Sequence, residues 1–296
     1  MKTFDLKGLG VALITPFKSD KSIDFKALGV LLDQLIEADA DYIVVLGTTG
    51  ETPALFPDEK KAIRDFVVNH VNGRIPLVLG LGGNNTLGIV KELKDTDLSG
   101  FSAVLSVVPY YNKPSQEGIY RHYKAISEAS PLPVVLYNVP GRTGVNMTPA
   151  TTLKLAEECD NIIGVKEASG NLSQIQEIIK RRKDGFVVVS GDDSITYPLM
   201  ALGVEGVISV LGNVFPKEFG EMVRLCLSGR HAEALPKHLK FHDLYSLLFV
   251  DGNPAGVKAA LTEMGVIENE LRLPLVPARE ETIEQIRKIL SEMKKS

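Results

Sequence analysis

Short runs rich in Val, Ile and Leu recur along the chain at spacings of roughly 25 to 30 residues, with helical patterns between them. Polar and apolar residues do not alternate within these runs, which is typical of parallel strands covered on both faces. We expect eight such strands, at residues 10–17, 42–47, 76–82, 103–111, 133–140, 162–169, 186–193 and 206–213.

Eight strand–helix units within about 225 residues match a (β/α)8 TIM barrel in both count and length. The main alternative, a doubly wound open sheet, more typically has about five to seven strands and a glycine fingerprint after the first of them. No GxGxxG follows the first run, and GxxxxGK[ST] occurs nowhere in the chain. The sequence therefore predicts an α/β fold built as a (β/α)8 barrel.

The strand signal stops after Val214, and only helical patterns follow it. We expect helices at 216–227, 231–249, 254–264 and 279–294, and we divide the chain into a catalytic barrel at 1–226 and a C-terminal helical domain at 227–296. Within the barrel, Asp24 is expected to cap the helix that follows it. Thr148 and Pro149 are expected to begin a helix that runs through Glu158.

Composition narrows the class of protein. Of the 296 residues, 44% are hydrophobic and 24% charged, as in ordinary soluble globular proteins. The net charge of −4 is spread over both signs without a basic face, so nucleic acid is not an expected partner. No apolar run approaches the roughly 18 residues of a membrane span. The first residues lack the apolar core of a signal peptide, and Cys159 and Cys226 form no CxxC. We therefore expect a cytoplasmic protein without disulfides.

Polar side chains gather where the expected strands end. In a (β/α)8 barrel the carboxyl ends of the strands carry the active site. The expected strands end in GTTGE (47–51), PYYN (109–112), YNVPGRTG (137–144), Lys166, SGDDS (190–194) and LGN (211–213). Hydroxyls, one amine and one guanidinium would thus converge over an apolar floor, and we expect the active site there.

Lys166 follows the apolar run at 162–165. One interpretation is a solvated lysine at the tip of a strand. The other is a nucleophile that forms Schiff bases, because an amine desolvated in an apolar site has a lowered pKa and a reactive unprotonated fraction. Glu167 is expected to point the other way, toward the helices, because adjacent strand residues face opposite sides.

The neighbouring polar residues are also open to two interpretations. Tyr137 is either a core tyrosine or a general acid and base beside Lys166 on the adjacent strand. Thr48 and Thr49 are either turn residues or donors to a carboxylate. Arg142 is either an exposed loop charge or a bidentate clamp for a carboxylate.

Two patterns are weak signals of other sites. GLGGNN (80–85) lacks the spacing of a phosphate-binding loop, and we expect a turn at the end of a strand. His238 and His242 lie four residues apart but have no accompanying HExxH glutamate, so no metal site is expected. We expect Asp192 and Asp193 to form a turn.

Five motifs taken together carry a resemblance. GTTGE, PYYN, YNVPGRTG, GVKEASG (164–170) and SGDD (190–193) occur in this order and together strongly resemble the dihydrodipicolinate synthases, also called 4-hydroxy-tetrahydrodipicolinate synthases. The similarity runs over essentially the whole chain. The wider family includes N-acetylneuraminate lyase and related 2-keto-acid aldolases. Its members share the (β/α)8 barrel and a lysine that forms a Schiff base with pyruvate.

The resemblance implies roles for single residues. Lys166 would condense with pyruvate, and the resulting enamine would attack L-aspartate 4-semialdehyde, a step of the diaminopimelate route to L-lysine. Tyr137, Thr48 and Tyr111 match the family's proton relay, with Tyr111 reaching in from a neighbouring subunit. The positions that match substrate contacts are Thr49, Arg142, Gly191 and, through its backbone, Ile208. The resemblance implies no cofactor beyond the covalent Schiff base, and a homotetramer made of two tight dimers.

The chain departs from the lysine-inhibited members of the family. Those enzymes often carry two histidines and a glutamate at the positions of Pro57, Lys60 and Gly88, whereas Asn84 and Tyr110 match. We therefore expect weak or absent inhibition by L-lysine. Two alternatives to the synthase remain. One is another pyruvate-dependent aldolase, such as N-acetylneuraminate lyase or a 2-keto-3-deoxy sugar acid aldolase, and the other is a catalytically silent barrel.

Overall fold

A computed structural model describes residues 4–293 and shows a closed barrel of eight parallel strands. Each strand pairs with the next along the chain, and β8 closes on β1. The strands are β1 (Gly8–Ala12), β2 (Tyr42–Val45), β3 (Leu77–Gly80), β4 (Ala103–Val107), β5 (Val134–Asn138), β6 (Ile162–Glu167), β7 (Val187–Ser190) and β8 (Gly206–Ser209). The (β/α)8 prediction is confirmed.

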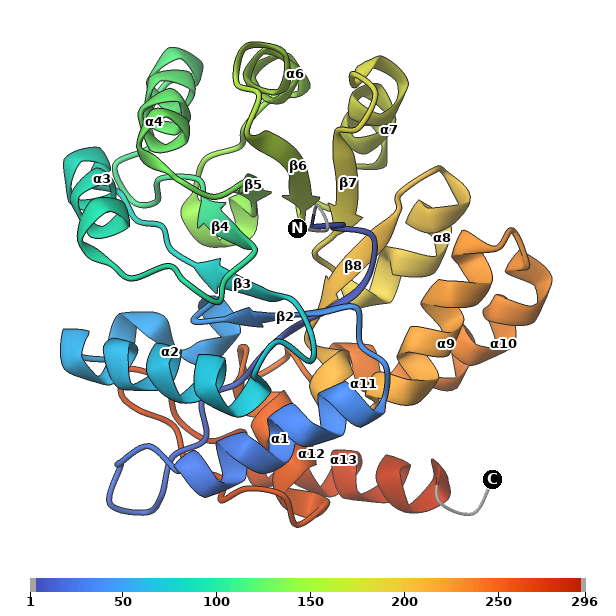
Figure 1. Ribbon diagram of the computed structural model, residues 1–296. Helices are drawn as coiled ribbons and strands as arrows, with labels where there is room; N and C mark the ends of the chain where they lie inside the picture. Colours follow the sequence, from blue (N-terminus) through green and yellow to red (C-terminus); the bar gives the residue numbers. More distant parts are fainter. Residues whose placement is uncertain (1–3, 294–296) are drawn as a thin grey trace.

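The helices form a ring around the strands (Figure 1). The ring consists of α1 (Phe25–Glu37), α2 (Pro57–Val71), α3 (Thr86–Asp95), α4 (Gln116–Ala129), α6 (Pro149–Glu158), α7 (Leu172–Arg181), α8 (Thr196–Ala201) and α9 (Pro216–Leu227). The chain continues through α10 (His231–Lys240), α11 (His242–Leu247), α12 (Ala255–Glu263) and α13 (Glu280–Met293). Short turns follow several strands, namely η1 (Thr48–Gly50), η2 (Thr52–Ala54), α5 (Pro140–Thr143), η3 (Asp193–Ile195) and η4 (Leu211–Asn213).

The two predicted helix starts are confirmed. Asp24 accepts a hydrogen bond from the backbone N–H of Ala27 at 3.0 Å and caps α1. The Thr148 hydroxyl accepts from the third residue of α6, whose first residue is proline. These contacts satisfy N–H groups that a helix leaves unpaired at its start.

The predicted strands run past their true ends. β1 ends at Ala12 although a strand to residue 17 was expected, and β4 ends at Val107 although one to residue 111 was expected. The residues beyond these ends, such as Leu13 and Val108, are apolar and buried but belong to loops. An apolar run reports burial, and burial continues beyond the last strand hydrogen bond. The predicted carboxyl ends of these two strands were therefore too late in the sequence, because buried loop residues were counted as strand.

One helix also differs from the prediction. The single helix expected over 231–249 is divided at Phe241 into α10 and α11, where the Phe241 ring packs against the rings of Phe215 and Tyr245. Helical periodicity continues through such a change of direction and does not reveal it. The last expected helix is α13, and position 294 lies outside the described residues.

Two apolar layers hold the barrel. One lies between the strands and the surrounding helices, and a second fills the barrel interior. The interior layer includes Tyr42, Val44, Val78, Leu105, Val135, Val189 and Ile208. A Cβ atom at Gly10 would lie 2.1 Å from the Tyr42 ring, so glycine there makes room for this large side chain. This packed layer is the floor beneath the strand ends.

A buried ion pair attaches the C-terminal helices to the loop after β2. Lys258 of α12 donates to Glu51 Oε1 at 2.5 Å, and both side chains are 0% exposed. The other Glu51 oxygen accepts the backbone N–H of Arg272 at 3.0 Å. Burial lowers the pKa of Lys258 to about 8, and the Glu51 carboxylate opposes that shift. The division of the chain into a barrel at 1–226 and a helical domain at 227–296 stays a proposal. The Lys258–Glu51 ion pair joins the two segments.

Within residues 4–293, none of the helices combines the length and the apolar character that a membrane crossing requires.

We predict that Lys258→Met destabilises the protein by about 3 to 5 kcal/mol, because it leaves the Glu51 carboxylate buried without its cation. The measurement is the free energy of unfolding in urea. Lys61→Met is the control, since Lys61 pairs with Asp65 at the exposed surface and should change stability by less than about 1 kcal/mol. Equal losses in the two variants would contradict the prediction.

Candidate active site

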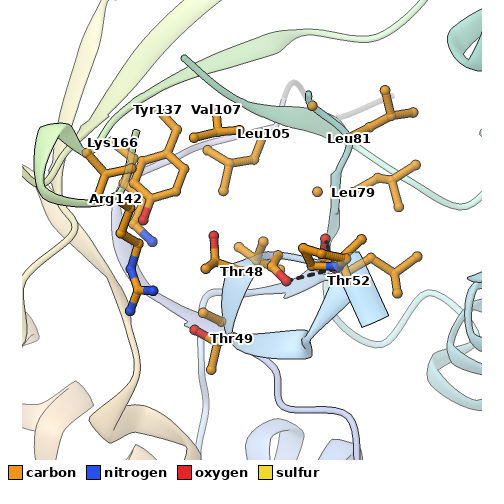
Figure 2. Close-up of a pocket in the computed structure, with 18 of the residues that line it drawn as sticks. Thr48, Thr49, Thr52, Leu79, Leu81, Leu105, Val107, Tyr137, Arg142 and Lys166 are labelled. Carbon is orange, nitrogen blue, oxygen red and sulfur yellow. Dashed lines mark hydrogen bonds between the residues drawn. The ribbon is translucent and has the colours of Figure 1, made fainter. Parts of the chain in front are cut away.

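A cavity opens at the carboxyl ends of the strands and contains the predicted lysine. Lys166, Tyr137, Thr48, Thr49 and Arg142 line two adjoining lobes of about 300 Å³ and 590 Å³. In Figure 2, Lys166, Tyr137 and Arg142 lie together on one side of the cavity, and the two threonines lie across from them. This geometry is consistent with the prediction that polar residues at the strand ends converge on one site.

Lys166 lies at the top of β6 and its side chain points into the barrel. The residue is 6% exposed. Its register partner on β5 is Tyr137, and its Nζ lies 4.4 Å from the centre of the Tyr137 ring. Burial lowers the pKa of Lys166 to about 8, with the Arg142 charge acting in the same direction and Asp193 opposing it. An appreciable fraction of this amine is therefore unprotonated near neutral pH, as a nucleophile requires.

Gly191, directly after β7, makes room for the Lys166 side chain. A Cβ atom at Gly191 would lie 2.8 Å from Lys166 Cε and 3.1 Å from its Cγ. Any side chain there would displace the lysine stem. Gly191 also lines the larger lobe of the cavity.

Tyr137 carries a hydroxyl on the strand next to Lys166, and its ring lies against the amine. Burial raises the pKa of Tyr137, while the Arg142 charge and a hydrogen bond with Thr48 lower it again. The phenol is therefore protonated at neutral pH, and its hydroxyl can both donate and accept a hydrogen bond. Thr48 is exposed to the cavity mouth.

The turn that carries both threonines is fixed from several sides. The Thr15 hydroxyl donates to the Gly50 carbonyl at 2.8 Å, and the Thr52 hydroxyl donates to the Leu46 carbonyl at 2.7 Å. Thr49 is buried, and its hydroxyl accepts from Nδ2 of Asn253 at 2.9 Å. The first N–H groups of a short helical turn have no partner within the turn. The turn can thus present hydroxyl and amide donors toward the cavity.

Arg142 lies on the one-turn helix α5 and is exposed. Its guanidinium has no hydrogen bond or ion pair to another residue in the range 4–293, yet it borders both lobes of the cavity. An unpaired guanidinium at the mouth of a cavity is suited to a carboxylate ligand.

Glu167 points away from the cavity, as expected. Its carboxylate accepts from Asn138 Nδ2 at 3.1 Å and from Gln174 of α7 at 2.8 Å. Burial raises its pKa, and these donors lower it. Glu167 is thus part of the contact between the strands and the helices, and it does not face the Lys166 amine.

Two candidate residues lie apart from the cavity of the same chain. Tyr111 is 88% exposed and has a positive φ of 74°. It is not among the residues that line either lobe. Ile208 is buried in the barrel interior and its side chain does not line the cavity. The roles given to both therefore rest on the resemblance.

Three positions bear on inhibition by lysine. Lys60 lines the smaller lobe together with Tyr110, whereas Pro57 and Gly88 do not line it. A Cβ at Gly88 would lie 3.2 Å from the side chain of Asn85. Weak or absent inhibition by L-lysine stays a prediction.

Sequence reasoning missed one residue that lines the cavity, Asn253, and one that raises the pKa of Lys166, Asp193. Asp193 was expected only as part of a turn, and it does begin η3. It is also buried, and its Oδ2 accepts the backbone N–H groups of Val210 and Leu211 at 2.9 and 2.7 Å. Burial raises its pKa to about 6. Asn253 lines the cavity from the C-terminal segment, and the DGNP motif indicated no more than a kink.

His238 belongs to an aromatic cluster. Its Nδ1 lies 3.0 Å from the Tyr245 hydroxyl, and its ring stacks on Tyr197 at 5.4 Å. Residues 4–293 contain no group of three or more His, Cys, Asp or Glu side chains arranged to hold a metal ion.

The fold and the cavity define a class: (β/α)8 barrels with a buried lysine of lowered pKa near the end of a strand. Residues 5–293 match the model of the dihydrodipicolinate synthetase family. A 4-hydroxy-tetrahydrodipicolinate synthase of Parabacteroides distasonis is 61% identical over 293 residues, which cover 99% of each chain. The chain belongs to the dihydrodipicolinate synthetase family.

Solved structures agree with this placement. The dihydrodipicolinate synthase of Aquifex aeolicus has a TM-score of 0.94 and 42% identity, with 98% of each chain covered. The enzyme of Acinetobacter baumannii, solved in complex with pyruvate, has a TM-score of 0.94 and 40% identity. That match covers 98% of this chain and 99% of the other.

We predict that Lys166 reacts with an amine-acylating reagent with a half-maximal rate near pH 8, its lowered pKa. Lys91 is the control, because its hydrogen bond to Asp95 raises its pKa above 10.5. Arg142→Gln should move the Lys166 midpoint upward, since the guanidinium lowers that pKa. Quantitative mass spectrometry of the two lysine peptides measures both acylation rates. If the rates of Lys166 and Lys91 were half-maximal at the same pH, the lowered pKa of Lys166 would be refuted.

Proposed function

We propose that this protein is a 4-hydroxy-tetrahydrodipicolinate synthase, which condenses pyruvate with L-aspartate 4-semialdehyde in the diaminopimelate route of L-lysine biosynthesis. The observation that carries the proposal is Lys166, buried against Tyr137 in a cavity that also presents Arg142 and the two threonines. The family and the 61% identity to a named synthase support the same reaction.

The first half of the proposed reaction takes place at Lys166. Its unprotonated amine attacks the keto carbon of pyruvate, and loss of water from the carbinolamine gives a protonated imine. This cation draws electrons from the neighbouring methyl group, which loses a proton and becomes the enamine carbon. Tyr137 and Thr48 supply and remove the protons, because the Tyr137 ring lies against the amine and its hydroxyl is hydrogen-bonded to Thr48.

The second half forms the carbon–carbon bond and releases the enzyme. The enamine carbon attacks the aldehyde carbon of the semialdehyde, whose carboxylate pairs with Arg142. The amino group of the semialdehyde then attacks the imine carbon and displaces Lys166, which closes the ring. In this scheme the lysine is regenerated, and no cofactor beyond the covalent Schiff base takes part. Thr49 and Thr48 hold the pyruvate carboxylate, and Gly191 and the backbone of Ile208 border the site.

Tyr111 is assigned to the proton relay of a neighbouring subunit. Its ring is 88% exposed and outside the cavity of its own chain, which supports a role across an interface. We propose a homotetramer made of two tight dimers, in the cytoplasm. A monomer would lack this part of the relay.

Other members of the wider family are the second candidate. N-acetylneuraminate lyase and the 2-keto-3-deoxy sugar acid aldolases also use a lysine Schiff base with pyruvate. Arg142 favours the synthase, because an unpaired guanidinium at the cavity mouth suits a short substrate with its own carboxylate. The joint presence of Lys166, Tyr137, Thr48 and Tyr111 argues against a catalytically silent barrel, which would have no reason to keep all four.

Borohydride reduction in the presence of pyruvate tests the mechanism. We expect one adduct, at Lys166, because reduction fixes an imine as a stable amine. Peptide mass mapping locates it, and an adduct elsewhere, or none, would refute the Schiff base. Turnover of pyruvate with L-aspartate 4-semialdehyde then separates the synthase from the sugar acid aldolases, which would act on longer hydroxylated aldehydes.

Replacement of Tyr111 tests the relay across subunits. Tyr111→Phe should lower kcat by roughly 100-fold, as expected for loss of a group that transfers protons, without lowering the yield of the pyruvate adduct at Lys166. Steady-state kinetics and sedimentation measure activity and assembly. Tyr110→Phe is the matched control at the neighbouring position. Activity of the Tyr111 variant close to that of the control would count against the relay.

A further inference from the structure

The C-terminal segment forms one wall of the active-site cavity. The larger lobe, which contains Lys166, is lined from this segment by His242, Asp243, Tyr245, Ser246, Phe249 and Asn253. Asn253 differs from most of these, since it is 6% exposed and makes a direct side-chain contact with a residue of the loop after β2. A polar side chain buried at this point requires an explanation.

The contact has a defined direction. Asn253 Nδ2 donates to Thr49 Oγ1 at 2.9 Å. A threonine hydroxyl has one proton and two lone pairs. Because Asn253 occupies a lone pair, the Thr49 proton stays available for another acceptor, and no acceptor for it is recorded among residues 4–293.

A carboxylate in the cavity would complete this arrangement. A carboxylate only accepts hydrogen bonds, so Thr49 can bind it only as a donor. Rotation of the Asn253 amide by half a turn would place Oδ1 against Thr49 and would take up the threonine proton. An amide that donates to Thr49 is thus the orientation compatible with an anion on the other side of the hydroxyl.

The second amide atom of Asn253 is also informative. Its Oδ1 is buried and has no hydrogen-bond partner within the described chain. An unsatisfied buried carbonyl oxygen costs free energy. Asn253 combines this open acceptor with a place at the wall of the Lys166 cavity and a contact with Thr49, and the combination favours a role for Asn253 beyond packing.

We propose that Asn253 is a positioning residue for pyruvate: it holds the Thr49 hydroxyl as an acceptor, so that this hydroxyl donates to the pyruvate carboxylate. The inference rests on the proposed function, because it takes pyruvate as the ligand. It also gives the C-terminal segment a part in substrate recognition. Asn253 itself touches no reacting atom and acts through Thr49.

The test measures the pyruvate concentration that gives half-maximal borohydride trapping at Lys166. Asn253→Ala removes the donor and should raise this concentration about tenfold, the effect of one lost hydrogen bond. Asn253→Asp keeps the shape but can only accept, and it adds a buried negative charge. It should raise the concentration by on the order of 100-fold. At saturating pyruvate both variants should still form the adduct.

A double-mutant cycle separates positioning from a merely structural role. In Thr49→Val, which lacks the hydroxyl, a further Asn253→Ala change should have little additional effect, because residues that act through one another are not additive. Asn269 is the matched control, since it is a C-terminal asparagine whose Oδ1 also lacks a partner in the described part of the chain, and it does not line the cavity. Asn269→Asp should leave the pyruvate dependence unchanged.

The outcomes are distinguishable. Wild-type protein without a pyruvate adduct at Lys166 would overturn the proposed function. A wild-type adduct with an unchanged pyruvate dependence in both Asn253 variants would overturn only the role of Asn253. The same conclusion would follow if Thr49→Val and Asn253→Ala had fully additive effects, or if Asn269→Asp shifted the pyruvate dependence as much as Asn253→Asp.

Discussion

The arrangement at the carboxyl ends of the strands depends on the burial of one amine, that of Lys166. An ammonium loses its hydration when it is enclosed in an apolar site, so the fold must either pair it or allow it to lose its proton. Lys166 is enclosed by the Tyr137 ring on one side and by the backbone at Gly191 on another. No ion pair with a carboxylate forms at its Nζ among the described residues. The lowered pKa follows from this enclosure.

Lys258 shows what the same chain does with a buried amine that is paired. It lies against the Glu51 carboxylate, with both groups fully enclosed, and binds α12 to the turn that carries Thr48 and Thr49. Burial lowers the pKa of both lysines to about 8. Geometry separates their roles, since Lys258 is held by Glu51 and by the Glu270 carbonyl, whereas Lys166 faces a cavity. A lowered pKa alone would not have distinguished them.

The sequence predicted the parts of the site that depend on strand order. Lys166 and Tyr137 lie near the ends of adjacent strands, so counting strands made their contact plausible, and the register pairs them. The exact strand ends did not follow, because buried loop residues such as Leu13 are as apolar as the strands. Asn253 could not be predicted, since its contact with Thr49 joins positions 204 residues apart. Tertiary packing alone brings them together.

In the proposed mechanism, the charges around Lys166 explain how one amine can serve two opposite needs. As a nucleophile it must be unprotonated, which burial and the positive charge of Arg142 both favour. As an imine it must carry a positive charge, which the same burial opposes. Asp193 favours the positive form, because its buried carboxylate raises the pKa of Lys166. Two backbone N–H groups hold this carboxylate in place. In the proposed mechanism, a substrate carboxylate that pairs with Arg142 would offset the guanidinium charge, and it would thereby favour the positive imine that follows attack by the neutral amine.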